Sequence, residues 1–245
     1  MKVFYDLHIH SCLSPCGSND MTPNNIVNMA KLAGLNIIAL TDHNSAKNCP
    51  AIIKAGQNAN IIVIPGMEVC TSEEIHVLCL FYDISSALAM DDFIFSKTPD
   101  IKNNSSIFGD QIIMDSNDNI IANEEKLLIN AADISIDNIS EIAGSFGGIT
   151  IPAHINKNSY SILSAFGYIP PECDFPSYEI TSKGDAVNLT KNYSVLQNKP
   201  LLLNSDAHYL EHISEPKAYF DLPECSAKAI LDAASGKIKC DWSRG

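Results

Sequence analysis

The stretch VFYDLHIH, residues Val3–His10, decides the fold. Its apolar and aromatic residues predict a β-strand close to the start of the chain. In an extended strand residues two apart face the same side, so His8 and His10 share one face while Leu7 and Ile9 cover the other. Two imidazoles on one face can bind the same metal ion. The opening strand therefore predicts both a sheet and a metal site at its end.

Strand-like and helical segments alternate after this strand. A helix is predicted to begin at Pro23, capped by Thr22, and to end near Gly34. The turn Pro65–Gly66 is expected to lead into Glu68. Such alternation indicates an α/β fold with a largely parallel sheet or barrel. Further strands are predicted over residues 37–42, 61–64, 148–153, 178–181 and 201–205.

One segment interrupts the alternation, at about residues 91–130. It is rich in Asn, Asp and Ser and carries two short apolar runs, Gln111–Met114 and Asn119–Ala122. We interpret it as an inserted hairpin, either a lid over a barrel or a plain surface loop. Since 245 residues suit one α/β barrel, residues 1–245 are predicted to form a single domain with this insertion.

The composition fits a folded chain that is poor in positive charge. Hydrophobic residues make up 46% and charged residues 18%, with a net charge of −13 and a single arginine, Arg244. Because binding to long polyanions relies on clustered Lys and Arg, we expect no long nucleic acid as a partner. Bound metals and lysines would instead hold a small anionic substrate.

The sequence contains no apolar run of eighteen residues and no signal-peptide pattern. It therefore predicts a cytoplasmic protein without a membrane partner. Its eight cysteines lack the spacing of a disulfide framework and are expected to be free thiols. Cys12, Cys16 and Cys49 follow histidine-containing stretches, so a thiol cluster that binds metal or responds to oxidation is one interpretation.

Metal-binding residue types gather after the predicted strands, where α/β barrels carry their active sites. His76 is an exception, since it precedes its apolar run. A hairpin that places Glu68 opposite His76 would bring the two side chains to the same ion. Mixed imidazole and carboxylate ligands suit Zn²⁺, Mn²⁺ and Fe²⁺. The other residues of this kind are His8, His10, His43, His154, Asp206 and His208.

Five motifs in order make the chain resemble the PHP (polymerase and histidinol phosphatase) superfamily. They are HIHS at 8–11, TDHN at 41–44, the Glu68–His76 pair, AH at 153–154 and SDAH at 205–208. The resemblance implies an irregular (β/α)7 barrel and a metal-dependent phosphoesterase. It also implies two to three divalent metal ions, with Zn, Mn or Fe as candidates, in what would be a trinuclear metal centre when complete.

Carried over by motif, the resemblance assigns each ligand. One metal would be held by His8, His10, Glu68 and Asp206, and a second by Glu68, His76 and His154, with Glu68 as the bridge. A third would take His43, His208 and Asp20, unless Asp20 merely helps to cap the helix beside Thr22. The catalytic roles would belong to Glu68, Asp206 and His208.

Residues around this set have weaker assignments. Lys157 and Lys183 are expected to contact substrate phosphate, although each also fits a solvated surface lysine. Asp6 and Asp42 are expected to orient metal-binding imidazoles. Phosphatases of the family often carry Pro and Arg after the alanine-histidine motif, where this chain has residues 155–157, INK. This departure leaves the substrate open.

Three hypotheses for the function follow. The leading one is a metal-dependent phosphoesterase that hydrolyses a small phosphorylated metabolite or nucleotide through a metal-activated hydroxide. The first alternative is an amidohydrolase-type enzyme that attacks a C–N bond with similar metals. The second is a metal-stabilised binding domain without catalysis.

Overall fold

The computed structural model describes residues 1–213, 215–216, 218–238 and 241–242. Arg244, the arginine considered above, and Cys240 lie outside the described residues. Within the described part, no helix has both the length and the apolar character needed to cross a membrane.

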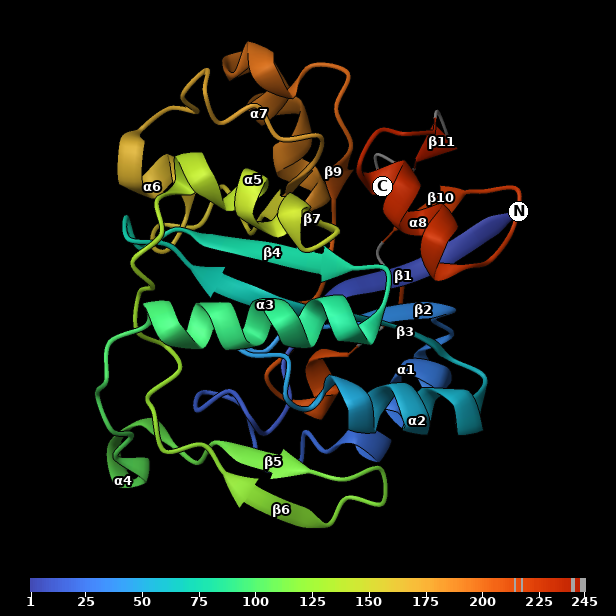
Figure 1. Ribbon diagram of the computed structural model, residues 1–245. Coiled ribbons are helices and arrows are strands. Elements are labelled where there is room, and N and C mark those ends of the chain that lie inside the picture. The colour runs from blue at the N-terminus through green and yellow to red at the C-terminus, as the bar shows by residue number, and fades with distance from the viewer. Residues whose placement is uncertain (214, 217, 239–240, 243–245) are drawn as a thin grey trace.

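The central sheet has seven strands: β1 (Lys2–Ile9), β2 (Ile37–Leu40), β3 (Ile62–Cys70), β4 (His76–Phe81), β7 (Gly148–Pro152), β10 (Tyr219–Asp221) and β11 (Asp241–Trp242). Their order is β11-β10-β1-β2-β3-β4-β7 (Figure 1). Strands β1, β2 and β3 are parallel to one another, whereas the remaining pairs are antiparallel. The sheet is therefore mixed and not largely parallel: besides the predicted hairpin of β3 and β4, the pairs β1–β10, β10–β11 and β4–β7 are antiparallel.

Two short pairs of strands complete the β structure: the hairpin β5 (Ile112–Met114) with β6 (Ile120–Asn123), and the parallel pair β8 (Tyr178–Glu179) with β9 (Leu201–Leu202). The Ile155 amide, after β7, donates to the Glu179 carbonyl at 2.9 Å, and a parallel bridge joins Ile9 to Ala207. These links lead the curled sheet from β7 back towards β1. The predicted irregular α/β barrel with an inserted hairpin is confirmed.

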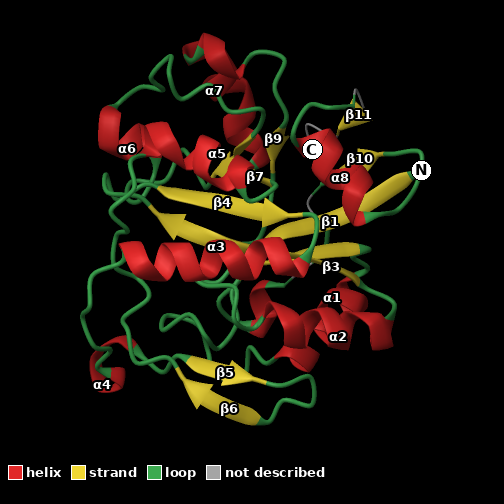
Figure 2. Ribbon diagram, in the orientation of Figure 1, coloured by secondary structure: helices red, strands yellow, loops and turns green. Residues whose placement is uncertain are grey.

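Helices surround the strands (Figure 2). Helix α3 runs across β3 and β4, while α1 and α2 lie together beside β2 and β3 (Figure 1). Short 3-10 turns at 183–185, 194–196 and 210–212 add to them. The helices are α1 (Pro23–Ala33), α2 (Cys49–Ala59), α3 (Ile84–Lys97), α4 (Ser105–Phe108), α5 (Ile136–Ser145), α6 (Ile162–Phe166), α7 (Ala186–Asn192) and α8 (Ala227–Ala234).

Helix α1 has the ends that its sequence predicts. The Thr22 hydroxyl accepts a hydrogen bond from the Asn25 amide at 3.3 Å, and Gly34 ends the helix with φ 84°. Ile26 and Val27 are buried against the sheet, where each stabilises the fold by roughly 1.5–3 kcal/mol.

Gly66 was predicted to lie in a turn, and this prediction is wrong. Strand β3 continues through Pro65 and Gly66 to Cys70. A Cβ at Gly66 would lie 2.7 Å from the Leu80 side chain and 2.8 Å from the Cys79 carbonyl oxygen. Glycine is needed here because β4 approaches closely. Glu68 therefore lies inside β3.

The register of the β3–β4 hairpin also differs from the prediction. Glu68 lies opposite Leu78, and Cys70 lies opposite His76. The turn is centred one residue later than the predicted pairing requires: it is closed by a 2.9 Å hydrogen bond from the Thr71 amide to the Ile75 carbonyl. A shift of two residues keeps the same side chains on the same face, so Glu68 and His76 still meet.

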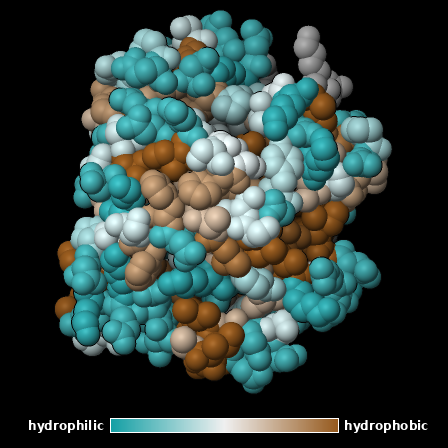
Figure 3. Space-filling view, in the orientation of Figure 1, coloured by the Kyte–Doolittle hydropathy of each residue, from teal (hydrophilic) through white to brown (hydrophobic). Residues whose placement is uncertain are grey.

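The insertion begins later than predicted, because α3 continues past residue 91 to Lys97. Asp91 is buried and accepts hydrogen bonds from the Ser45 hydroxyl at 2.7 Å and the Ala46 amide at 2.6 Å. The β5–β6 hairpin packs against the loop after β1, and its apolar side chains form a brown patch at the bottom of Figure 3. Treating the whole chain as one domain stays a prediction.

Candidate metal centre

The predicted metal-binding residues come from separate segments and meet at one place. His8 lies in β1 and His10 directly after it, Glu68 lies inside β3, and His76 begins β4. His43, His154, Asp206 and His208 lie in the loops that follow β2, β7 and β9. His8, His10, His43, Glu68 and His154 are buried, while His76, Asp206 and His208 are partly exposed.

Glu68 is at the centre of this cluster. Both of its carboxylate oxygens contact imidazoles, so it is placed to bridge two ions. Burial opposes its charge, yet the neighbouring histidines hold the pKa of Glu68 well below its usual value. Oε1 lies 2.9 Å from His76 Nδ1 and 3.2 Å from both His8 Nε2 and His154 Nε2, and Oε2 lies 3.0 Å from His43 Nδ1 and 3.5 Å from His10 Nε2.

Asp206 closes one side of the cluster. Its Oδ1 lies 3.3 Å from His8 Nε2 and 3.4 Å from His10 Nε2. Although burial disfavours its charge, His8 and His10 lower the pKa of Asp206 far below the ordinary range. The Nδ1 of His208 hydrogen-bonds the backbone carbonyl of Asp206 at 2.9 Å, which leaves Nε2 free to bind an ion.

Several potential metal-ligand atoms, imidazole nitrogens and carboxylate oxygens, face each other without forming hydrogen bonds. This arrangement fits metal ions. His43 Nδ1 and Glu68 Oε2 are 3.0 Å apart and buried, yet neither has a hydrogen-bond partner in the described part of the chain. Such buried atoms are costly unless a cation satisfies them. The structure contains three groups of residues in which the potential ligand atoms lie within 4.8 Å of one another. They are His8, His10 and Glu68; His43, Glu68 and His76; and His10, His43 and His208.

Asp20 does not lie where the resemblance implied. It is exposed, and its carbonyl oxygen accepts a hydrogen bond from the Asn25 side chain at 3.0 Å. The loop turns tightly at Gly17, and the Ser18 amide donates to the His208 carbonyl at 2.9 Å, so the chain reaches the histidines earlier. It is the Cys16 thiol that contacts His43 and His208. Although Cys16 is exposed, its thiol is partly desolvated, which opposes ionisation; hydrogen bonds with His208 and His43 outweigh this and lower the pKa of Cys16 to about 6.

The predicted cluster of three thiols does not form. Cys12 and Cys49 are buried away from the imidazoles, with their sulfurs 3.7 Å from the Ile112 carbonyl and 3.5 Å from the Gly66 carbonyl. Burial raises the pKa of Cys12 to about 12, so this thiol is unreactive at neutral pH.

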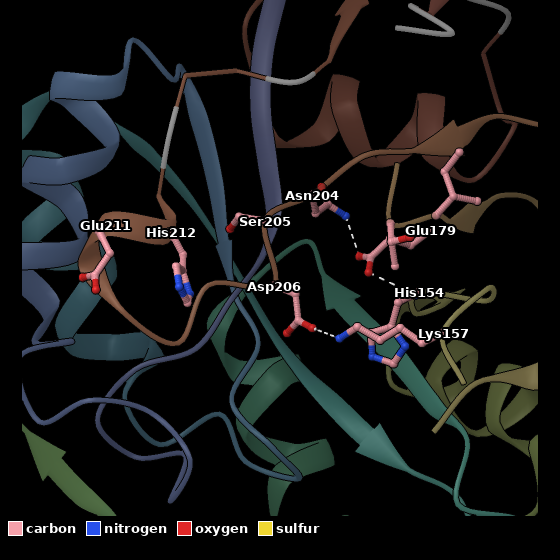
Figure 4. Close-up of a pocket in the computed structure, with 10 residues that line it drawn as sticks. His154, Lys157, Glu179, Asn204, Ser205, Asp206, Glu211 and His212 are labelled. Atoms are coloured by element: carbon pink, nitrogen blue, oxygen red, sulfur yellow. Dashed lines mark hydrogen bonds and ion pairs between the residues drawn. The ribbon is translucent and has the colours of Figure 1, made fainter. Parts of the chain in front are cut away.

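Glu179 is a site residue that the sequence analysis missed. Its carboxylate accepts hydrogen bonds from the Asn204 side chain at 2.7 Å and the His154 amide at 3.0 Å (Figure 4). It also accepts a hydrogen bond from His8 Nδ1 at 3.0 Å. Burial disfavours its charge, but His8 and His154 lower the pKa of Glu179. By holding a proton on Nδ1, Glu179 leaves Nε2 of His8 free for a metal.

Asp6 and Asp42 support the site through other groups than the rings themselves. Asp6 accepts from the backbone amides of His8 at 3.3 Å and Ser205 at 3.1 Å. Asp42 accepts from the Ser14 hydroxyl at 2.7 Å, and the Ser14 oxygen lies 2.9 Å from His10 Nδ1. They therefore fix the chain around the imidazoles instead of contacting the rings.

A cavity of about 480 Å³ opens beside the cluster, with Lys157 and Asp206 on its wall. Lys157 forms an ion pair with Asp206, and Glu211 and His212 face them from the other side (Figure 4). Burial opposes its charge, but Asp206 raises the pKa of Lys157, which keeps it positively charged. Lys183, the other predicted phosphate contact, is exposed and lies outside this cavity.

A smaller cavity of about 200 Å³ leads directly to the metal-binding side chains. Lys157 and Asp206 line it as well, so the two cavities adjoin. The Tyr160 ring stacks on the His76 imidazole with centroids 4.8 Å apart and shields one wall. His154 and Asp206 hold positive φ angles of 30° and 52°, conformations that cost on the order of 1 kcal/mol each and are typical of functional sites.

Part of the chain is similar to a curated enzyme. Over 103 residues it is 35% identical to the 5'-3' exoribonuclease Rnm of Salmonella typhimurium, a match that covers 39% of this chain and 33% of the enzyme. A 5'-3' exoribonuclease of Haemophilus influenzae is 33% identical over 82 residues, which are 32% of this chain and 29% of that enzyme. The chain thus spans about a third of the length of these relatives.

Solved structures share the fold. The lesion-specific endonuclease PfuEndoQ from Pyrococcus furiosus superposes with a TM-score of 0.70 at 20% identity, covering 99% of this chain and 58% of that one. An endonuclease Q complex with a 27-mer duplex containing an abasic lesion gives a TM-score of 0.67 at 20% identity, covering 98% and 58%.

These findings overturn one prediction. The net charge of −13 and the scarcity of arginine were expected to exclude long nucleic acid as a partner. The endonuclease with the same fold was solved on duplex DNA, and the curated relatives are exoribonucleases, so the exclusion is wrong. Net charge fails as a guide because ions bound at a site and a few local contacts can hold phosphate where the overall charge is negative.

The family is decided by a direct match. The model of the PHP domain matches residues 6–169, which is more than half of the chain. The matched range contains His8, His10, His43, Glu68, His76 and His154, and Asp206 and His208 join them in space. The chain belongs to the PHP domain family.

Proposed function

We propose that the protein is a metal-dependent phosphoesterase that hydrolyses phosphodiester bonds in nucleic acid. The observation that carries this proposal is the buried cluster around Glu68, with five imidazole contacts to a single carboxylate. Beside this cluster, Lys157 lines an open cavity. The family and the exoribonuclease relatives support the same chemistry.

The residues fit two to three divalent ions. His8, His10, Glu68 and Asp206 would hold the first, and Glu68, His76 and His154 the second. His43 and His208 would hold the third, with Cys16 as the further donor in place of Asp20. Zn²⁺, Mn²⁺ and Fe²⁺ all accept imidazole and carboxylate ligands, and a thiolate favours Zn²⁺ among them.

Bound ions would activate water and neutralise charge on the phosphate. The protein's own groups orient and bind. Glu179 keeps His8 in one tautomer, and Lys157 lies at the junction of the two cavities, where its charge can attract a non-bridging phosphate oxygen. Since Lys157 pairs with Asp206 in this structure, binding of phosphate would compete for the ammonium group.

The test compares Glu68→Gln with wild type on a short single-stranded oligonucleotide. Glu125→Gln is the matched control, because Glu125 is exposed and distant from the cluster. We expect at least a hundredfold loss of turnover in Glu68→Gln and no change in Glu125→Gln. The bridging carboxylate would hold the ions that stabilise developing charge, and loss of one such stabilising interaction costs about 10²–10³ in rate. Equal turnover in all three proteins would refute the proposal. Turnover of amides without turnover of phosphodiesters would favour the amidohydrolase alternative.

A further inference from the structure

A further cavity, of about 620 Å³ and referred to below as the second cavity, adjoins the cavity of about 480 Å³ beside the metal-binding cluster. Lys157 and Thr181 line both, so a molecule bound to Lys157 can extend from one into the other. None of the proposed metal ligands lines the second cavity. It is separate from the metal centre. Lys157, the residue proposed to contact phosphate, lies at its border with the cavity of about 480 Å³.

Neutral amides form much of the polar lining of this cavity. Asn188 and Asn192 lie four residues apart in α7 and so share one face of the helix, and Asn158 lines the cavity from the loop after β7. All three are exposed, and within the described residues their side chains have no hydrogen-bond partner. Each amide offers both a donor and an acceptor to a ligand.

Part of the wall is apolar or aromatic. Leu163 and Leu189 line it, together with the Tyr193 ring at the end of α7. A ligand with flat apolar faces and a rim of donors and acceptors would match this wall, and a nucleobase has both. Aromatic side chains bind bases of any sequence by stacking.

The second cavity carries few charged side chains. Lys157, at the border, and Asp185 are the charged residues that line the second one. The Asp185 carboxylate already accepts from the Asn156 side chain at 2.9 Å and the Ser182 hydroxyl at 2.8 Å. The anionic part of a ligand therefore belongs at Lys157, and the neutral part belongs beside the asparagines of the second cavity.

We propose that this second cavity binds the base and sugar of the nucleotide next to the phosphate that is cleaved. The inference rests on the proposed function and names the subsite that recognises its substrate. Recognition by neutral amides and stacking needs few phosphate contacts, and this agrees with a chain that carries a net charge of −13.

The test uses Tyr193→Ala and the double variant Asn188→Ala, Asn192→Ala. The control is Asn138→Ala, at an exposed position of α5. Each is measured on a dinucleotide and on an abasic analogue that carries the same phosphodiester. We expect kcat/KM for the dinucleotide to fall about tenfold or more in Tyr193→Ala, as loss of one base-stacking contact does. A similar fall is expected in the double variant, because two hydrogen-bonding amides are lost. Turnover of the abasic analogue should not change.

Alanine is a better helix former than asparagine, so the double variant should keep its melting temperature. Tyr193→Phe, which keeps the stacking ring, should retain the wild-type preference for the dinucleotide. Equal effects on both substrates, or no effect on either, would overturn the subsite while leaving the proposed function in place. If wild type hydrolyses neither substrate, the proposed function fails, and the subsite with it.

Discussion

Replacing Glu179 by glutamine tests the residue that orients the metal centre. The carboxylate uses Oε1 for the His154 amide at 3.0 Å and Oε2 for the Asn204 side chain at 2.7 Å, and His8 Nδ1 lies within 3.1 Å of both oxygens. Glutamine has one oxygen and one NH₂ group, so at least one of these buried donors would face another donor. An unpaired buried donor costs about 1–3 kcal/mol.

We therefore expect Glu179→Gln to lower the unfolding free energy of the metal-free protein by about 1–3 kcal/mol. Because His8 also loses an ionised acceptor, its affinity for metal should fall about 10–100-fold. Urea unfolding and competition against a chromogenic chelator measure the two effects. Glu172→Gln, at an exposed site seven residues earlier, is the control and should change neither. Metal affinity in Glu179→Gln within twofold of wild type would refute the role assigned to Glu179.

Three further predictions concern other parts of the protein. Cys16→Ser should lose metal from the third site. Elemental analysis should find one ion fewer per chain, and the cobalt-loaded protein should lose its thiolate-to-cobalt absorption. Unchanged metal content and an unchanged cobalt spectrum would exclude the thiol as a ligand. Lys157→Ala should lower kcat/KM for an oligonucleotide about tenfold or more through loss of a charged phosphate contact, whereas the exposed Lys31→Ala should not; equal values would remove Lys157 from substrate binding. Asp83 caps α3 through the Ser86 amide at 2.9 Å, and hydrogen bonds from Ser85 and Ser86 lower its pKa to about 2. Because its folded pKa lies below the unfolded value of 3.8, this cap stabilises above pH 4 and its contribution is lost as the pH falls towards 2. The loss from Asp83→Ala, about 1 kcal/mol at pH 7, should therefore shrink in acid, and a pH-independent difference would contradict the capping role.

Local signals in the sequence predicted much of the framework. Thr22, Pro23 and Gly34 mark the ends of α1 because capping and backbone freedom are properties of single residues. His10, His43, His154 and His208 follow strands, and strand ends meet at one edge of the sheet. In contrast, Pro65 and Gly66 resembled a turn, since a glycine required by a neighbouring strand looks the same in sequence as a glycine in a turn.

The missed and misplaced residues depend on contacts between distant segments. Glu179 lies between the buried residues Tyr178 and Ile180, and a lone acid in an apolar strand is the signal that could have found it. The loop from Ser11 to Met21 has no periodicity, so which of Cys16 and Asp20 reaches the histidines depends on the path of the backbone. Only the folded chain fixes that path.

The most direct test of the metal-dependent activity is elemental analysis coupled to turnover of a short oligonucleotide, before and after chelation. We predict two to three divalent ions per chain, loss of turnover when they are removed, and recovery when Zn²⁺, Mn²⁺ or Fe²⁺ is returned. Fewer than one ion per chain together with turnover that chelation leaves unchanged would contradict the account.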